Sequence, residues 1–237
     1  MKKEQYLGVN VSALTYDEIL DDLRFRIKEG KQSTVIAVNP EKVITANKNP
    51  LVKELINEST YQIPDGVGVL LASKLKGGTL RERVTGIDMM ERLLRFAAEE
   101  NYGVFFYGAK EEVVSEAKRK LEDRFPTLNI AGYENGYMKD NDALVEKINA
   151  SGANILFVAL GSPKQELWIR ENMPRLNVKV FQGVGGSFDV FSGKIKRAPA
   201  FYRKFGLEWL YRLMKEPKRI KRQMNLPLFL MKVLFSR

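Results

Sequence analysis

The stretch of residues 154–186, NILFVALGSPKQELWIRENMPRLNVKVFQGVGG, indicates how this chain folds. It opens with Asn154–Leu160, a nearly continuous apolar run that predicts a buried strand. Ser162-Pro163 then begins a helical pattern that reaches about Asn172, and Val178–Gln182 is a second buried strand that runs into glycines. Strands separated by helices in this way are typical of a mostly parallel sheet.

The same alternation continues on the N-terminal side of this stretch. Ser33–Val38 is followed by a helix opened by Asn39-Pro40-Glu41, and Gly103–Tyr107 by a charged helix from Glu111 to about Arg124. We therefore expect an α/β fold, a Rossmann-like and mostly parallel sheet covered by helices on both faces. Ligands of such sheets usually bind beyond the carboxyl ends of the strands.

Composition limits the chemistry. The chain has 237 residues, 44% of them hydrophobic and 29% charged, which is typical of one medium-sized globular unit or two small lobes that share a core. It contains no Cys and no His, so disulfides, thiol nucleophiles, imidazole bases and ordinary zinc sites are excluded. Acid–base chemistry must use carboxylates, Lys or Tyr. No apolar run is long enough to cross a bilayer and the N-terminus lacks a signal-peptide pattern, so we expect neither secretion nor a membrane span.

Charge divides the chain into two predicted regions. Residues 194–237 hold 13 Lys or Arg and two acidic residues, a net charge of +11, whereas the whole chain carries +10, so residues 1–193 sum to −1. This predicts a nearly neutral α/β body, 1–193, and a basic helical appendage, 194–237, that meets an anionic partner. Helices are expected over roughly Pro199–Lys215 and from about Pro217. The apolar end, Leu226–Phe235, is interrupted by Pro227 and either packs on the body or lies in a membrane interface.

Two loops carry candidate site residues. Asp65 lies in a tight loop before a helix expected over Val67–Leu75, where it acts either as a general base or as a helix cap or Asx-turn residue. Gly161-Ser162-Pro163 lies between a strand and a helix, where backbone N–H groups and the helix dipole suit a phosphate. The alternative is an ordinary turn with Ser162 as the helix cap. Lys164 and Gln165, which follow directly, can face a ligand.

Three further motifs contain possible site residues. Gly183–Asp189 allows close backbone approach to a ligand but lacks the third glycine of a dinucleotide fingerprint. Arg83 places a guanidinium just before a helix. Asp140-Asn141-Asp142 resembles a metal-binding Asp-x-Asp motif, but we interpret it as the cap of a helix over Ala143–Asn149, so no metal is predicted.

Taken together, seven motifs resemble the WecG/TagA/CpsF glycosyltransferases, most closely the TagA branch, in collinear order over essentially the whole chain. They are Val38-Asn39-Pro40-Glu41, Pro64-Asp65-Gly66-Val67-Gly68, Arg83-Val84-Thr85-Gly86, Tyr107-Gly108-Ala109-Lys110, Gly161-Ser162-Pro163-Lys164-Gln165-Glu166, Gly183-Val184-Gly185-Gly186-Ser187-Phe188-Asp189 and Lys196-Arg197-Ala198-Pro199.

The resemblance implies an inverting enzyme of wall teichoic acid synthesis that needs no metal or other cofactor. Such an enzyme moves N-acetylmannosamine from UDP-N-acetylmannosamine to undecaprenyl-diphosphate-linked N-acetylglucosamine and forms a β-1,4 linkage. It would be cytoplasmic and associate peripherally with the inner face of the cell membrane. In this branch Thr usually precedes the Val-Asn-Pro-Glu run, whereas this chain has Ala37.

The resemblance also implies roles for individual residues. Asp65 would be the base, with Arg83, Asn39 and Gln165 beside the sugars. The substrate phosphates would meet Arg212, Arg219 and Arg222, for which the alternative is that they are solvated arginines on a basic face. Apart from the resemblance, we assign the nucleotide pocket to Gly108, Tyr137, Gly161, Lys164, Gly185 and Asp189.

The sequence also allows other interpretations. A related transferase with UDP-N-acetylmannosaminuronic acid or UDP-glucose as donor would have much the same pattern. A nucleic-acid-binding module would explain the basic aromatic tail but not the neutral body, and nucleic acid is not expected as a partner. Self-association through a face that the tail normally covers is a further expectation.

Overall fold

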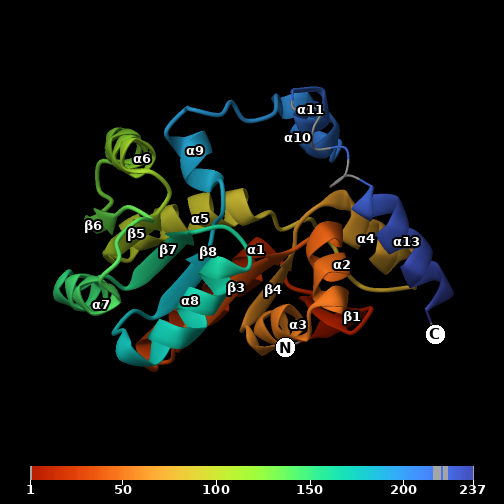
Figure 1. Ribbon diagram of the computed structural model, residues 1–237, viewed down its shortest axis with the longest axis horizontal. Helices are drawn as coiled ribbons and strands as arrows, with labels where there is room; N and C mark the ends of the chain where they lie inside the picture. The colour runs from red at the N-terminus through yellow and green to blue at the C-terminus, as the bar shows by residue number, and fades with distance from the viewer. Residues whose placement is uncertain (1, 216–219, 221–223, 237) are drawn as a thin grey trace.

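The computed structural model describes residues 2–215, 220 and 224–236. Within these residues, a six-stranded parallel sheet with the strand order β4-β3-β8-β7-β5-β6 forms the centre of the protein (Figure 1). The strands are β3 (Ser33–Val38), β4 (Tyr61–Pro64), β5 (Val104–Gly108), β6 (Ile130–Glu134), β7 (Ile155–Ala159) and β8 (Val180–Gly183). The predicted α/β class and parallel sheet are confirmed.

Helices cover both faces of the sheet because the strands are apolar on both sides. In β7, Ile155 and Phe157 join one apolar cluster, and the alternate residues Leu156 and Val158 join another; all four side chains are fully buried. The first cluster contains residues of α1 (Tyr16–Lys28), α5 (Gly86–Glu99) and α6 (Glu111–Arg124), and the second contains residues of α7 (Asn141–Ala150) and α8 (Lys164–Asn172).

A third apolar cluster joins the two ends of the chain. It contains residues of the antiparallel ribbon β1 (Lys3–Tyr6) and β2 (Val9–Ser12), of β3, and of α2 (Pro40–Lys48), α3 (Pro50–Glu58), α4 (Val67–Leu75) and α13 (Asn225–Phe235). The ribbon was not predicted because its strands are too short for the sequence pattern to reveal.

The apolar C-terminal segment packs on the body, which confirms one of the two sequence-based alternatives. Phe229 and Val233 of α13 are buried in the third cluster, and the ring of Phe229 lies edge-on to that of Tyr6 with 6.3 Å between centroids. Pro227 does not interrupt α13 because it lies in the first turn, where a backbone N–H has no intrahelical partner.

The rest of the appendage differs from the expectation in one respect. A single helix over Pro199–Lys215 is wrong: the chain leaves α9 (Ser187–Phe191) and forms two short helices, α10 (Ala200–Lys204) and α11 (Glu208–Lys215), with a turn at Gly206 between them (Figure 1). Most of the segment expected from Pro217 lies outside the described residues. Among the described helices, none has the length and apolar character needed to cross a bilayer. The division into body and appendage at residue 193 stays a prediction.

The buried aromatic of α13 should contribute strongly to stability. Phe229→Ala should lower the free energy of unfolding by about 3–5 kcal/mol, because it removes a fully buried ring and leaves a cavity. Phe235→Ala, on the same helix but 85% exposed, should change it by less than about 0.5 kcal/mol. Urea denaturation of both variants provides the comparison, and equal effects would contradict the described docking of α13.

Candidate active site

The parallel sheet brings most of the predicted site residues to one edge. Because all strands run in the same direction, the loops after their carboxyl ends lie side by side in the strand order β4-β3-β8-β7-β5-β6. In that order these strand ends carry Asp65, Asn39, Gly185, Gly161, Gly108 and Tyr137; Gly108 is the last residue of β5, and the others follow their strands.

Asp65 is placed by the end of β4 and the start of α4. Its backbone N–H donates to the carbonyl of Val38 at 2.8 Å, which extends the pairing of β4 with β3 by one residue. Gly66 then turns the chain with a φ of 97°, a conformation that favours glycine, and occupies the cap position of α4. Asp65 is therefore not the N-cap residue of α4, and its interpretation as an Asx-turn residue stays a prediction.

The carboxylate of Asp65 lies beside the first residue of α5. A β-carbon built on Gly86 would be 3.8 Å from Asp65 Oδ2 and 3.3 Å from the β-carbon of Ala37. Ala37, where the resemblance described above implies Thr, therefore has Gly86 as a neighbour in common with Asp65. The positive end of the α5 dipole also favours a negative charge at this place.

Arg83 lies in the loop before α5, and residues of the appendage hold its side chain. Its Nη2 lies 3.1 Å from Glu208 Oε2 and donates to the carbonyl of Arg203 at 3.4 Å. The loop itself is fixed by the hydroxyl of Tyr16, which accepts from the Thr85 N–H at 2.7 Å and donates to the Arg83 carbonyl at 3.3 Å. Burial raises the pKa of Tyr16 to about 12, so this hydroxyl stays neutral and keeps its proton to donate.

Asn39 and Gln165 have structural partners. Asn39 caps α2 by accepting from the Lys42 N–H at 2.9 Å. Gln165 is buried; its Oε1 accepts from the Gly185 N–H and its Nε2 donates to Glu166 Oε1, both at 3.1 Å. Both residues therefore fix the loops at the sheet edge, which is compatible with a further contact to a ligand.

An ion pair that the sequence did not predict joins α2 and α8, the helices that follow two of these loops. Lys42 Nζ lies 2.8 Å from Glu166 Oε1, and the two side chains are 13% and 3% exposed. Burial alone would raise the pKa of Glu166, but the charge and hydrogen bond of Lys42, together with the Gln165 amide, hold it below its usual range. No sequence signal pairs two residues 124 positions apart.

Of the three glycines predicted for the nucleotide, Gly185 and Gly161 follow the neighbouring strands β8 and β7, and Gly108 is the last residue of β5. At Gly108 a β-carbon would lie 2.5 Å from the carbonyl oxygen of Ala159, so any larger residue would push β5 away from β7. The helix after Gly161, α8, starts at Lys164 and has no side-chain cap, so the interpretation of Ser162 as its cap is wrong. The N-terminus of α8 follows directly after this loop.

The remaining predicted nucleotide residues, Lys164, Asp189 and Tyr137, lie in three separate segments of the fold. Lys164 is exposed, and Asp189 lies 3.9 Å from Lys194 Nζ. Tyr137, 68% exposed, follows β6 at the sheet edge opposite to β4. Five inter-strand spacings of ~4.8 Å separate these strands by roughly 24 Å, and the role of Tyr137 in the nucleotide pocket stays a prediction.

Other expectations concern metals and arginines. Asp140 caps α7, accepting from the Ala143 N–H at 3.0 Å, which confirms the capping interpretation. Among the described residues no three acidic side chains gather where a metal could bind.

The structure describes Arg212 only as part of the α11 backbone, and Arg219 and Arg222 lie outside the described residues.

Comparison with known proteins decides the family. The sequence model of the glycosyl transferase WecG/TagA/CpsF family matches residues 4–237. The chain belongs to this family. It is also similar to an N-acetylglucosaminyldiphosphoundecaprenol N-acetyl-beta-D-mannosaminyltransferase of Bacillus spizizenii, with 40% identity over 208 residues, 88% of this chain and 81% of the relative.

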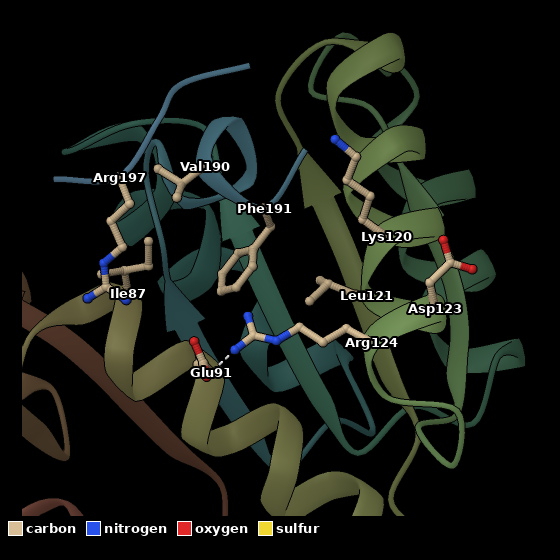
Figure 2. A pocket seen from close by; sticks show the side chains of 9 residues that line it. All are labelled: Ile87, Glu91, Lys120, Leu121, Asp123, Arg124, Val190, Phe191 and Arg197. Carbon is tan, nitrogen blue, oxygen red and sulfur yellow. Dashed lines mark hydrogen bonds and ion pairs between the residues drawn. The ribbon is translucent and has the colours of Figure 1, made fainter. Parts of the chain in front are cut away.

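The cavity in Figure 2 is separate from the predicted site residues at the sheet edge. It has a volume of about 530 Å³ and lies between α5, α6 and α9. At one end Arg124 points toward Glu91, and at the other end Arg197 lies beside Ile87. None of the predicted catalytic or nucleotide residues lines it, so we place the active site at the strand ends.

The buried ion pair yields a stability prediction. Lys42→Met should destabilise the protein by about 3–5 kcal/mol at neutral pH, because it leaves the Glu166 carboxylate buried without its cation. Folding of this variant should raise the pKa of Glu166 above the usual 4.5, so its stability should fall as the pH rises from about 4.5.

In the unmodified protein the lowered pKa has the opposite effect: the contribution of Glu166 is present above pH 4.5 and is lost as the pH falls through its folded-state pKa. Chemical denaturation from about pH 3 to pH 8 measures both slopes. The double variant Lys42→Met/Glu166→Gln should recover part of the loss, and a double variant no more stable than Lys42→Met would contradict the pairing.

Proposed function

We propose that this protein transfers N-acetylmannosamine from UDP-N-acetylmannosamine to undecaprenyl-diphosphate-linked N-acetylglucosamine, as a step of wall teichoic acid synthesis. The observation that carries the proposal is the 40% identity, over 88% of this chain, to a Bacillus spizizenii protein named for that transfer. The family match over residues 4–237 supports the reaction class.

Asp65 is the proposed general base. It would accept the proton of the acceptor 4-hydroxyl while the hydroxyl oxygen bonds to the anomeric carbon of the donor sugar. The bond from that carbon to the diphosphate breaks on the opposite face, and UDP leaves with the electron pair, so the anomeric centre inverts. One base suffices for this reaction. In a chain without His or Cys, a carboxylate at the sheet edge is a suitable group.

The leaving diphosphate gains negative charge and needs a cationic or hydrogen-bonding environment. Metal independence is part of the proposal, so this environment would consist of protein groups. The backbone N–H groups after Gly161 and the start of α8 provide one such set. Arg83, with Arg212, Arg219 and Arg222 of the appendage, would provide the cations for substrate phosphates.

The lipid-linked acceptor requires work at a membrane surface. We propose peripheral association with the inner face of the cytoplasmic membrane, since residues 194–237 carry a net charge of +11 and each Lys or Arg near an anionic leaflet contributes about 1 kcal/mol. The appendage also exposes the apolar side chains of Phe201, Phe205, Met231, Leu234 and Phe235.

Removal of the base tests the mechanism. Asp65→Asn should lower kcat by about 10²–10⁴-fold, because the proton of the attacking hydroxyl loses its acceptor, while binding of UDP stays unchanged. The measurements are acceptor-dependent UDP release with a lipid-diphosphate N-acetylglucosamine analogue, and calorimetric titration with UDP. The matched control is Asp21→Asn, a carboxylate 74% exposed on α1, which should retain full activity.

Three outcomes separate the parts of this proposal. Unchanged turnover of Asp65→Asn would remove this residue from the mechanism. Loss of UDP release in EDTA would overturn metal independence. Release with UDP-glucose or UDP-N-acetylmannosaminuronic acid, but not with UDP-N-acetylmannosamine, would replace the donor and keep the reaction class.

Ala37 yields a prediction of increased activity. Ala37→Thr should raise kcat/KM by about 2–10-fold, the value of one added hydrogen bond, because the hydroxyl would lie next to Gly86 and the Asp65 carboxylate. The same UDP-release assay measures this change. A decrease with intact stability would mean that the donor sugar needs the space that Ala37 leaves.

A further inference from the structure

Two ion pairs connect the appendage to residues 83–88. One involves Arg83 in the loop before α5, and the other involves Asp88 at the start of this helix. Arg83 Nη2 lies 3.1 Å from Glu208 Oε2, at the first residue of α11. Arg197 forms an ion pair with Asp88 in the first turn of α5, and its Nε lies 3.9 Å from Glu208 Oε1. Residues 83–88 and 197–208 are therefore linked through alternating charges.

These ion pairs are partly shielded from water. The side chains of Arg83 and Arg197 are 18% exposed, that of Glu208 is 11% and that of Asp88 is 32% exposed, whereas the surface pair of Arg170 and Glu54 is 39% and 56% exposed. Shielded charges interact more strongly than solvated ones, and loss of one partner leaves the other uncompensated. The network therefore contributes to holding α11 in place.

Asp88 takes part as a charged group. Burial alone would raise its pKa, but the hydrogen bonds from Thr85 and Arg197 hold it below its usual range. The Asp88 Oδ2 atom lies 2.6 Å from the Thr85 hydroxyl, which also caps α5. Thr85 in turn donates its backbone N–H to Tyr16. The network thus ends in the loop that positions Arg83.

The contact with Glu208 engages only part of the Arg83 guanidinium. Within the described part of the chain, the Arg83 side chain contacts Glu208 and the Arg203 carbonyl through Nη2 alone. A guanidinium is planar and rigid, so fixing one nitrogen also fixes the direction of Nε and Nη1. Those nitrogens keep N–H groups that can donate to a substrate oxygen.

A second contact places the appendage beside the loop that carries the proposed base, Asp65. The turn between α10 and α11 lies against the loop after Asp65: a β-carbon on Gly206 would be 3.3 Å from that of Val67. Arg212 follows Glu208 one turn later on α11. A carboxylate at the start of α11 can therefore set the position of this helix and the orientation of Arg83 together.

We propose that Glu208 is a positioning residue that acts through Arg83: it closes α11 over the Asp65 loop and orients the Arg83 guanidinium toward the substrates. The catalytic part of this proposal rests on the proposed transferase function. Glu208 is not placed in contact with the reacting atoms. Its loss should therefore affect the rate of transfer more than the binding of the donor.

Kinetics of three variants test the role. Glu208→Gln keeps the size of the side chain but removes its charge, and should lower kcat about ten-fold or more with little change in KM for UDP-N-acetylmannosamine. Glu208→Asp keeps the charge and should recover part of kcat. Glu54→Gln, which breaks an exposed ion pair of α3 with α8, is the matched control and should behave like the unmodified protein.

Hydrogen exchange provides a readout independent of catalysis. Amides of residues 200–211 should exchange about ten-fold or more faster in Glu208→Gln than in Glu54→Gln, while those of β5 and β7 stay unchanged and show that the variant is folded. If the unmodified protein transfers no sugar, the proposed function fails while exchange still tests the closure.

Two results would overturn the proposal. Exchange and kcat of Glu208→Gln that match those of Glu54→Gln would show that Glu208 positions nothing. A kcat that rises in Glu208→Gln would show that the contact restrains Arg83 instead of orienting it for catalysis.

Discussion

The pairing of β3 with β8 is the constraint on which the site depends. It aligns Ser33 with Val180, Thr34 with Phe181 and Val35 with Gln182, and it joins strands far apart in the sequence into one parallel sheet. Without this pairing, β3 and β4 would form one small unit and β5 to β8 another. With it, the loops after β3 and β8 become neighbours, and the Lys42–Glu166 pair and the Gln165–Gly185 hydrogen bond tie the adjacent loops together. The sheet edge is therefore rigid where the substrates are proposed to bind.

Local patterns predicted the framework well because local physics decides it. The helix α2 starts after Asn39, since the Asn side chain caps it and Pro40 suits the first helical position. The predicted bounds of α4 and α6 also agree with the structure, although neither helix has a side-chain cap. The apolar runs of β3 and β7 are long enough to identify as buried strands, and the order of loops along the edge follows from parallel pairing.

Partners distant in sequence could not be predicted. Arg83 and Glu208 are 125 residues apart, and neither spacing nor composition relates them. Glu166 stood in a recognised motif, yet only the folded chain reveals that Lys42 neutralises it. The break between α10 and α11 was missed for a different reason: Gly206 was included in a continuous helix, although glycine commonly ends one. In the structure Gly206 has a φ of 70°, and the Leu207 N–H donates to the carbonyl of Tyr202 at 2.7 Å, so a local signal ends α10.

The apolar cluster that joins the two ends of the chain has a consequence for synthesis. Tyr6 and Phe229 lie on elements that are far apart in the sequence, β1 and α13, yet their rings are in contact in the folded protein. The surface that α2, α4 and the β1–β2 ribbon offer to α13 stays open until α13 itself has been synthesised. Late, non-local closure of this kind slows folding and leaves apolar surface exposed in the growing chain. Until α13 packs, the nascent protein therefore depends on protection from aggregation at the surface that this helix covers.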